Sequence, residues 1–274
     1  WNVDGHLGLG FHGANKAVPQ AVEGLSDVVE IEVGDSLVCA RSTGGATRCW
    51  GKNESGQLGL GSTTARSMPD GPVQTTDGTP VDLESLAVGG DFACGRYQGE
   101  TVCWGHDHYG QLGDGLSGNP AVNPWVSPGA GELLGELSSL DLGFVHACGL
   151  DADGGVWCWG DGYYGQMGNA EALTTNATPQ QVLTEDGSPL EAATDVFTGR
   201  LFSCALVGPS GEAWCWGKNE FGQIGDGTTE NALTARPVKV SEESEETLSG
   251  VEHLGLGADF ACALTQGGQE VWCW

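Results

Sequence analysis

A Cys-Trp pair recurs five times along the 274 residues, and this recurrence constrains the fold more than any other feature. Each of the first four pairs is followed by a Gly and a short segment that ends in Gly-Gln, an apolar residue and Gly. Self-similarity at a fixed period indicates a repeat architecture, so we predict one structural unit used five times. The pairs lie between 54 and 58 residues apart, at Cys49-Trp50, Cys103-Trp104, Cys158-Trp159, Cys215-Trp216 and Cys273-Trp274.

The N-terminus carries a further copy of the segment that follows each Cys-Trp pair. Residues 1–10 (WNVDGHLGLG) align with residues 52–61 (KNESGQLGLG), and the tryptophan missing from this copy is supplied by Trp274 at the other end. Such a permutation is how propellers close, because both termini then contribute strands to one blade and no sheet edge is left free. We therefore predict a ring closed by the terminal segments. The alternative is a five-repeat window cut from a longer array.

A strand pattern precedes each Cys-Trp pair, in which small and apolar residues alternate between glycines. Examples are Val33–Cys39 and Leu256–Cys262, and such alternation is typical of β-strands. No window sustains a 3.6-residue period, so we expect almost no helix. The predicted fold is an all-β propeller and a single domain over residues 1–274. Its repeat units fall near residues 1–49, 50–103, 104–158, 159–215 and 216–274, about 50–58 residues each.

The motif of Trp-Gly followed by Asn-x-x-Gly-Gln-Leu-Gly is present in full at Trp50–Gly59, with variants in the other units. It resembles the regulator of chromosome condensation repeat, and the resemblance covers essentially the whole chain. The resemblance implies a β-propeller with about one blade per unit, most often seven blades, so five units depart from the common number. It also implies, as the family's best-known activity, nucleotide exchange on a small nuclear GTPase with docking on chromatin.

Every unit contains two cysteines whose midpoint falls on a turn. Residues placed symmetrically about a hairpin turn face each other across the two strands, at a separation that suits a disulfide. We predict five disulfides; buried reduced thiols and zinc binding are the alternatives, and no Cys-x-x-Cys or His/Cys cluster has zinc-ligand spacing. The predicted pairs are Cys39–Cys49, Cys94–Cys103, Cys148–Cys158, Cys204–Cys215 and Cys262–Cys273.

Charge and cysteines together oppose a nuclear role. The chain has 37 acidic and 10 basic residues, a formal charge of −27, whereas nucleic-acid binders usually carry a basic patch. Disulfides persist in oxidising compartments, which indicates the extracellular space, the cell surface or the periplasm. No run of 18 apolar residues is present, so we expect no membrane insertion. Nucleic acid is not an expected partner.

Residues that repeat at one position are expected to serve packing. This applies to the tryptophans of the Cys-Trp pairs and to Gln57, Gln111, Gln166 and Gln223, whose buried amides can satisfy backbone groups. Tyr109, Tyr164 and Phe221 share the turn position before a Gly, where other copies have Ser55 and Asp4. Packing over the turn is the plain interpretation, and an aromatic rim on one face is the functional one.

The longest non-repetitive stretch, residues 114–136, is expected to be an irregular insertion. It contains Asn119-Pro120 and Asn123-Pro124-Trp125. Binding residues concentrate on loops held by a rigid scaffold, and an exposed Trp is a common energetic centre of an interface. Trp125 and Asn123 are therefore candidate binding residues, with local burial of Trp125 as the alternative.

Motifs for catalysis are absent from the sequence: it has no Gly-x-Ser-x-Gly elbow, His-Glu-x-x-His helix or phosphate-binding loop. His106 and His108, and the Asp-Gly pairs at Asp114 and Asp226, are best explained as turn residues rather than metal ligands. We expect no cofactor, no metal and no enzymatic activity. The predicted function is an extracellular or cell-surface scaffold for a protein partner; a lectin-like glycan-binding propeller is the alternative, and an enzyme with a central-channel site is favoured less.

Overall fold

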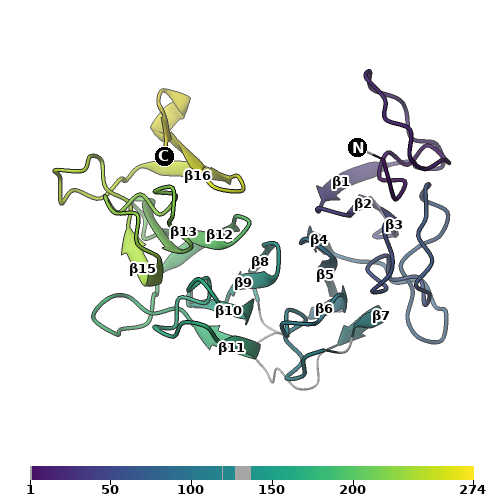
Figure 1. Cartoon of the computed structure of the whole chain (residues 1–274), viewed down its shortest axis with the longest axis horizontal. Coiled ribbons are helices and arrows are strands. Elements are labelled where there is room, and N and C mark those ends of the chain that lie inside the picture. Colours follow the sequence, from purple (N-terminus) through teal and green to yellow (C-terminus); the bar gives the residue numbers. More distant parts are fainter. Residues whose placement is uncertain (1, 119, 127–136) are drawn as a thin grey trace. The chain divides into compact units, whose positions relative to one another are not determined.

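The computed structural model describes residues 2–118, 120–126 and 137–274, and it consists of five antiparallel sheets (Figure 1). The all-β prediction is confirmed: within the described residues the helical content is one short 3₁₀ turn, Gln266–Gly268. The chain divides into two compact units, residues 1–135 and 136–274.

The first unit contains two sheets, and neighbouring strands in each are consecutive in sequence. The three-stranded sheet is extended by an isolated bridge between Gly51 and Arg66. Its strands are β1 (Val28–Val33), β2 (Leu37–Ser42) and β3 (Thr47–Gly51), and the four-stranded sheet has β4 (Ser85–Val88), β5 (Phe92–Tyr97), β6 (Glu100–Gly105) and β7 (Ala121–Val126).

The second unit contains three sheets with the same meander order. Two of them have four strands and the last has three. The strands are β8 (Ser139–Leu142), β9 (His146–Leu150), β10 (Val156–Asp161) and β11 (Thr175–Gln181); β12 (Ala193–Thr198), β13 (Phe202–Val207), β14 (Glu212–Gly217) and β15 (Ala232–Pro237); and β16 (Val251–Leu256), β17 (Ala261–Thr265) and β18 (Val271–Cys273).

The second and third strands of every sheet form the hairpin that the cysteine spacing predicted. Each cysteine is the direct partner of the other across the hairpin, as in the pairing of Cys204 with Cys215. All five predicted disulfides are present, with Cα–Cα separations of 4.0–4.1 Å, and no cysteine is free. The disulfides therefore fix the register of each hairpin, which in turn decides which side chains face the core.

The sheets straddle the repeat boundaries set by the Cys-Trp pairs. The first three strands of a sheet precede the Trp-Gly step and the fourth follows it, so β14 ends at Gly217 and β15 pairs back onto it through Ala232. The same holds for β7, which pairs with β6 by placing Trp125 opposite Cys103. The expectation of an irregular insertion over residues 114–136 is therefore wrong for residues 121–126, because Ala121, Trp125 and Val126 pair with β6 on either side of a bulge that includes Pro124.

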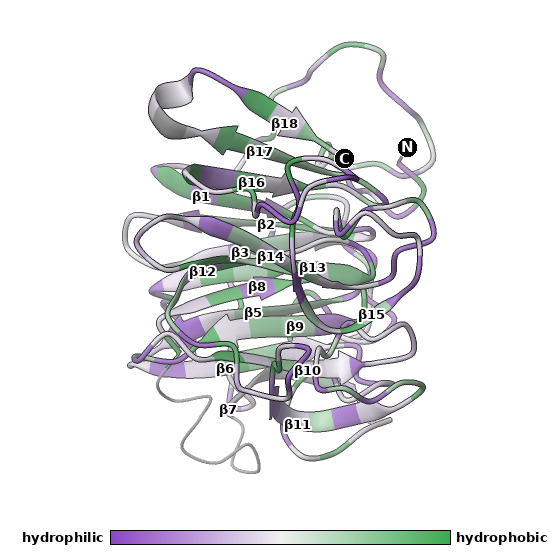
Figure 2. Cartoon of the chain, turned by 90° about the vertical axis from the view of Figure 1, so that its left-hand side faces the viewer, coloured by the Kyte–Doolittle hydropathy of each residue, from purple (hydrophilic) through white to green (hydrophobic). Residues whose placement is uncertain are grey.

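The core lies between and within the sheets and contains the repeated tryptophans. Trp104, Trp159 and Trp216 are fully buried, together with the apolar residues of the Gly-Gln-x-Gly segments, Leu58, Met167 and Ile224. Figure 2 shows hydrophobic colour along strands such as β9 and β13, while acidic residues interrupt β1. A buried aromatic of this size removes about 150–250 Å² from water, so the tryptophans carry much of the packing energy.

Closure of the ring and the single-domain organisation concern the placement of the two units, and both stay predictions. Residues 2–8 adopt the turn of the other copies, since Trp50 Nε1 donates to the carbonyl of His6 at 2.9 Å. This confirms that the N-terminal segment is a repeat copy. No helix among the described residues has the length and apolar character needed to cross a membrane.

Candidate functional site

The turns that follow each Trp-Gly step are held by an asparagine in three of the five copies. Asn53 Oδ1 accepts the Leu58 N–H at 3.0 Å, and its Nδ2 donates to the carbonyls of Ser62 and Thr64 at 2.8 and 2.9 Å. Asn2 and Asn219 make the equivalent bonds. One side chain therefore fixes both sides of the turn and the loop that follows it.

The glutamine of each turn is fully buried and fixes the residue two places before it. Its Oε1 accepts the backbone N–H of Ser55, Tyr109, Tyr164 or Phe221 at 2.8–2.9 Å. This confirms the structural role predicted for these glutamines. It also explains why the aromatic residues sit at a defined place, since their own backbone is the group that the glutamine holds.

The backbone carbonyl of the same glutamine links one repeat to the next. The indole of Trp104 donates to Gln57 at 3.0 Å, Trp216 donates to Gln166 at 3.0 Å, and Trp274 donates to Gln223 at 2.9 Å. A buried indole N–H needs such a partner. The repeated tryptophans therefore join successive sheets, as their repetition predicted, and are not surface binding residues.

In the second unit, two of the three predicted turn aromatics lie in one exposed patch formed by Tyr163, Tyr164, Lys218 and Phe221, here called the tyrosine patch. The rings of Tyr163 and Tyr164 meet edge to face at 4.8 Å, and Lys218 Nζ lies 5.7 Å from Tyr164 and 5.4 Å from Phe221. Phe221 is 68% exposed and Tyr163 is 56% exposed. Packing over the turn does not explain such exposure.

The lysine at the centre of the tyrosine patch is paired with acids. Its Nζ lies 3.1 Å from Glu220 and 3.6 Å from Asp259. Burial lowers the pKa of Lys218, but the hydrogen bond that Lys218 donates to Glu220 and the charge of Asp259 outweigh burial and raise the pKa above its usual value. The patch is therefore aromatic with an acidic border, a surface that suits a cationic or aromatic partner group.

The third predicted aromatic, Tyr109, belongs to the first unit and has a different neighbourhood. Its ring meets His108 edge to face at 4.9 Å, and His106 lies 6.3 Å away. His106 Nδ1 contacts Gln111 Nε2 at 2.8 Å, and burial lowers the pKa of His106. The two histidines therefore belong to a turn cluster, as expected, together with Tyr109.

The remaining predicted binding residues, Asn123 and Trp125, have backbones in β7. Their side chains lie outside the described residues, as does the segment 127–136, so their binding role stays a prediction. Asp226, which the sequence assigned to turn chemistry, binds Arg236 Nη1 at 2.6 Å and Thr228 N at 2.9 Å. Burial raises the pKa of Asp226, but these hydrogen bonds outweigh burial and hold it below its usual range.

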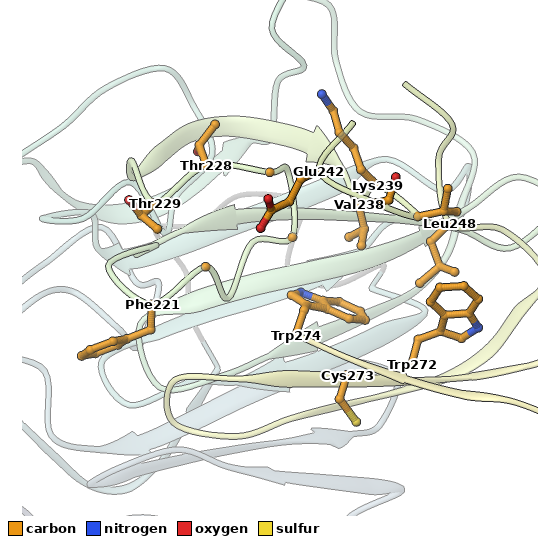
Figure 3. Close-up of a pocket in the computed structure, with 15 residues that line it drawn as sticks. Phe221, Thr228, Thr229, Val238, Lys239, Glu242, Leu248, Trp272, Cys273 and Trp274 are labelled. Carbon is orange, nitrogen blue, oxygen red and sulfur yellow. The ribbon is translucent and has the colours of Figure 1, made fainter. Parts of the chain in front are cut away.

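A pocket of about 530 Å³ lies beside the tyrosine patch, and residue patterns did not reveal it. Figure 3 shows Trp272 and Trp274 projecting from the end of the chain toward Val238 and Leu248, with Phe221, Thr228 and Glu242 around the opening. A sequence signal did exist, namely a second tryptophan two places before the repeated one, at Trp157, Trp214 and Trp272. Trp272 is 37% exposed.

A buried His-Ser pair is present in the second unit but cannot act on a substrate. His146 Nε2 lies 2.8 Å from Ser203 Oγ, and both side chains are fully buried. Burial lowers the pKa of His146 to about 3, so the imidazole is neutral at physiological pH. His146 fills the position that Phe92 and Phe202 occupy in other sheets, which makes the pair a packing element. Among the described residues, no group of three potential ligands is placed to hold a metal.

These features define a class: an all-β repeat protein whose sheets are propeller blades, with successive blades joined by a hydrogen bond from a tryptophan indole to a backbone carbonyl. The family model of the regulator of chromosome condensation (RCC1) repeat matches residues 49–97, 153–206 and 210–264, and a second model of the same repeat matches 138–166 and 193–223. The first model alone covers more than half of the chain. The chain belongs to the RCC1 repeat family.

Similar proteins share the repeat but are longer. The ultraviolet-B receptor UVR8 of Arabidopsis thaliana is 29% identical over 248 residues, which are 88% of this chain and 52% of the receptor. The probable E3 ubiquitin-protein ligase HERC4 of Homo sapiens is 29% identical over 81% of this chain and 20% of the ligase. The chain thus spans about half of the one and a fifth of the other.

Solved structures support the same fold. Prp20p of Saccharomyces cerevisiae superposes with a TM-score of 0.75 at 21% identity, covering 100% of this chain and 64% of Prp20p. The CRINKLY WD40 ectodomain of the Arabidopsis thaliana receptor kinase ACR4 superposes with a TM-score of 0.50 at 18% identity, covering 95% and 69% of the two chains. At these identities the likeness concerns the fold alone.

Proposed function

We propose that this chain is a non-catalytic protein-interaction scaffold of an oxidising compartment, and that its second unit binds a partner through the tyrosine patch. The observation that carries the proposal is the exposure of Tyr163 and Phe221 on turns that buried glutamines hold in both cases and that Asn219 also holds beside Phe221. Aromatic side chains on a fixed backbone lose little conformational entropy on binding, which favours them as interface centres.

The compartment is inferred from the cysteines. Ten cysteines in five disulfides leave no free thiol, and such pairs persist outside the reducing cytosol. The similarity to a receptor-kinase ectodomain adds an example of this fold at a cell surface. Acid-quenched alkylation of the protein in its own cells tests the assignment; we expect all ten cysteines to resist alkylation until reduction, and ten free thiols would contradict it.

The partner is inferred to present a basic surface. A charge of −27 and the acidic border of the patch, Glu220 and Asp259, favour cations by attraction over several ångströms. Prp20p binds Gsp1p and histones, which is a precedent for protein ligands on this fold. For the present chain, association should slow as salt is raised, because surface charges are screened.

A photo-crosslinking experiment tests the proposed patch. A benzoylphenylalanine placed at Phe221 should capture a discrete protein, while the same residue placed at Ser210, in a hairpin turn of the same unit, serves as the matched control. The additional changes Tyr163→Ser and Tyr164→Ser should abolish capture at position 221 without unfolding the chain. Equal capture at positions 221 and 210, or capture unaffected by the serine changes, would contradict the proposal.

Glycan binding is the second candidate, and the pocket beside the tyrosine patch favours it. Phe221 and Trp272 offer ring faces for stacking on sugars, and Thr228, Thr229 and Glu242 offer polar groups. A glycan array should show binding that Trp272→Ala removes and Trp125→Ala leaves unchanged if this pocket is the site. Loss through Trp125→Ala instead would assign the sugar to β7.

A further inference from the structure

Asp107 occupies the turn position that Asn2, Asn53 and Asn219 occupy in other copies. It performs one half of the asparagine's role, since its Oδ1 accepts the Leu112 N–H at 3.2 Å, as Asn53 accepts the Leu58 N–H. The side chain is fully buried. The backbone also follows the same path, because the Gly118 N–H donates to the Asp107 carbonyl at 2.6 Å and Gly13 donates to Asn2 at 2.6 Å.

The other half of the asparagine's role is not performed by a carboxylate. In the three asparagine copies Nδ2 donates to two carbonyls of the following loop, at 2.8–3.3 Å. In Asp107 the corresponding atom is Oδ2, which is buried without a hydrogen-bond partner. A carboxylate oxygen only accepts, so it cannot bond to carbonyls, whereas a protonated carboxyl has one O–H to donate.

We propose that Asp107 is a neutral carboxylic acid in the folded protein, that its O–H replaces the asparagine amide as the donor to the loop at residues 113–118, and that ionisation of Asp107 releases this loop. In the sequence the loop precedes β7, the strand that contains the candidate residues Asn123 and Trp125. The proton therefore controls how firmly the start of this segment is anchored. The proposal is independent of the function proposed above.

The surroundings of Asp107 favour the neutral form. Burial raises the pKa of Asp107 to about 7; the Leu112 N–H opposes this, and the charge of Asp114 on the loop adds to it. The neighbouring titratable groups on the same turn are His106 and His108, and His106 is influenced in turn by Asp91 and Lys52 from adjoining segments. Burial lowers the pKa of His106, so it supplies no full positive charge near neutral pH.

The sign of the pH dependence follows from this direction. The pKa of Asp107 is higher in the folded protein than in the unfolded chain, so the folded protein binds more protons at pH values between these two pKa values. The stabilisation is complete below about pH 4, declines as the pH rises toward 7, and is lost above the folded pKa. The loop should therefore be firmly held in acid and looser in mild base.

Hydrogen exchange at the Gly118 amide, which bonds to the Asp107 backbone carbonyl, tests the proposal directly. After correction for intrinsic rates, we expect wild-type protection to fall by about tenfold or more between about pH 5.5 and about pH 8, one decade being the effect of one pKa unit. Asp107→Asn should keep the Gly118 amide protected at both pH values, and the Leu112 amide, which bonds to the side chain and not to the loop, should stay protected in both proteins. The reverse change, Asn53→Asp, should give the loop after Asn53 the same pH dependence, and Asn219→Asp provides a second copy should that variant fail to fold.

Three results would overturn the proposal. Equal wild-type protection at both pH values would show that Asp107 does not titrate in this range. The same pH dependence in Asp107→Asn would assign the effect to His106, His108 or Asp114. Restored protection at about pH 8 on adding millimolar calcium, reversed by EDTA, would show that a cation rather than a proton fills the site.

Discussion

The sheets β12–β15 and β16–β18 are neighbours in the second unit. They contain the same hairpin but differ in how deeply it is buried. Cys204 pairs with Cys215 and Cys262 with Cys273 in the same register. Yet Phe202 is fully buried while Phe260, the equivalent residue, is 57% exposed. The local pattern therefore decides the hairpin, whereas burial depends on a surface supplied by another part of the fold.

The difference affects one side of the last sheet only. Trp274 keeps the bond to the preceding repeat that Trp216 also makes, at 2.9 and 3.0 Å. Among the described residues, the last sheet has no fourth strand beside β18, and no side chains bury Phe260. Residues 14–21 align with β15 in the repeat and are exposed, so ring closure would supply both.

The largest expected effect is on the two phenylalanines. Phe202→Ala should lower the free energy of unfolding by about 3–5 kcal/mol, since it leaves a cavity in a packed core. If the ring closes as predicted, Phe260 is covered and Phe260→Ala should cost about 2–4 kcal/mol. Denaturant unfolding of both variants measures this. A loss under about 1 kcal/mol at Phe260 would show an open end and refute closure.

The disulfides give the next effect. Replacing both cysteines of one hairpin by Ala should cost about 2.5–3 kcal/mol in the chain-entropy model for a loop of about ten residues. Cys204 and Cys215 are fully buried, whereas Cys273 is exposed. Mild reductant should therefore open Cys262–Cys273 first, as mass spectrometry after alkylation would show. Simultaneous reduction of all five disulfides would contradict the difference in burial between the last disulfide and the others.

The smallest expected effect concerns the bond that the two sheets share. Trp216→Phe and Trp274→Phe each remove an indole donor and leave a backbone carbonyl unpaired. The free energy of unfolding should fall by about 1–3 kcal/mol for the buried Trp216 and by less for the half-buried Trp274. Thermal unfolding of the two variants provides the comparison. A larger loss at Trp274 than at Trp216 would show that the last sheet is better covered than its exposure indicates.

Much of the fold was predictable because the decisive signals are local. Symmetric cysteines about a turn set the pairing of each hairpin, and the recurrence of Trp50 through Trp274 set the number of sheets. The strand β7 was missed because Asn123-Pro124 interrupts its alternation, and its pairing to β6 is a tertiary effect.

The candidate site was predictable only in part. The position of Tyr164 and Phe221 followed from the repeat, but their joint contact with Lys218 depends on how two sheets pack. The pocket beside Trp272 was missed for the same reason. The presence of Asp107 in place of the repeated asparagine is visible when the repeats are aligned. Its significance depends on the burial of its unpartnered oxygen, which the sequence does not show.

Each disulfide closes a segment of 9–11 residues inside one hairpin, and none joins two sheets. Under tension applied through the chain ends, the segment between the two cysteines of a hairpin cannot extend. At 3.3–3.6 Å per residue, each sheet would withhold about 30–40 Å of contour length. Each hairpin would therefore release this length only after its cysteines were reduced.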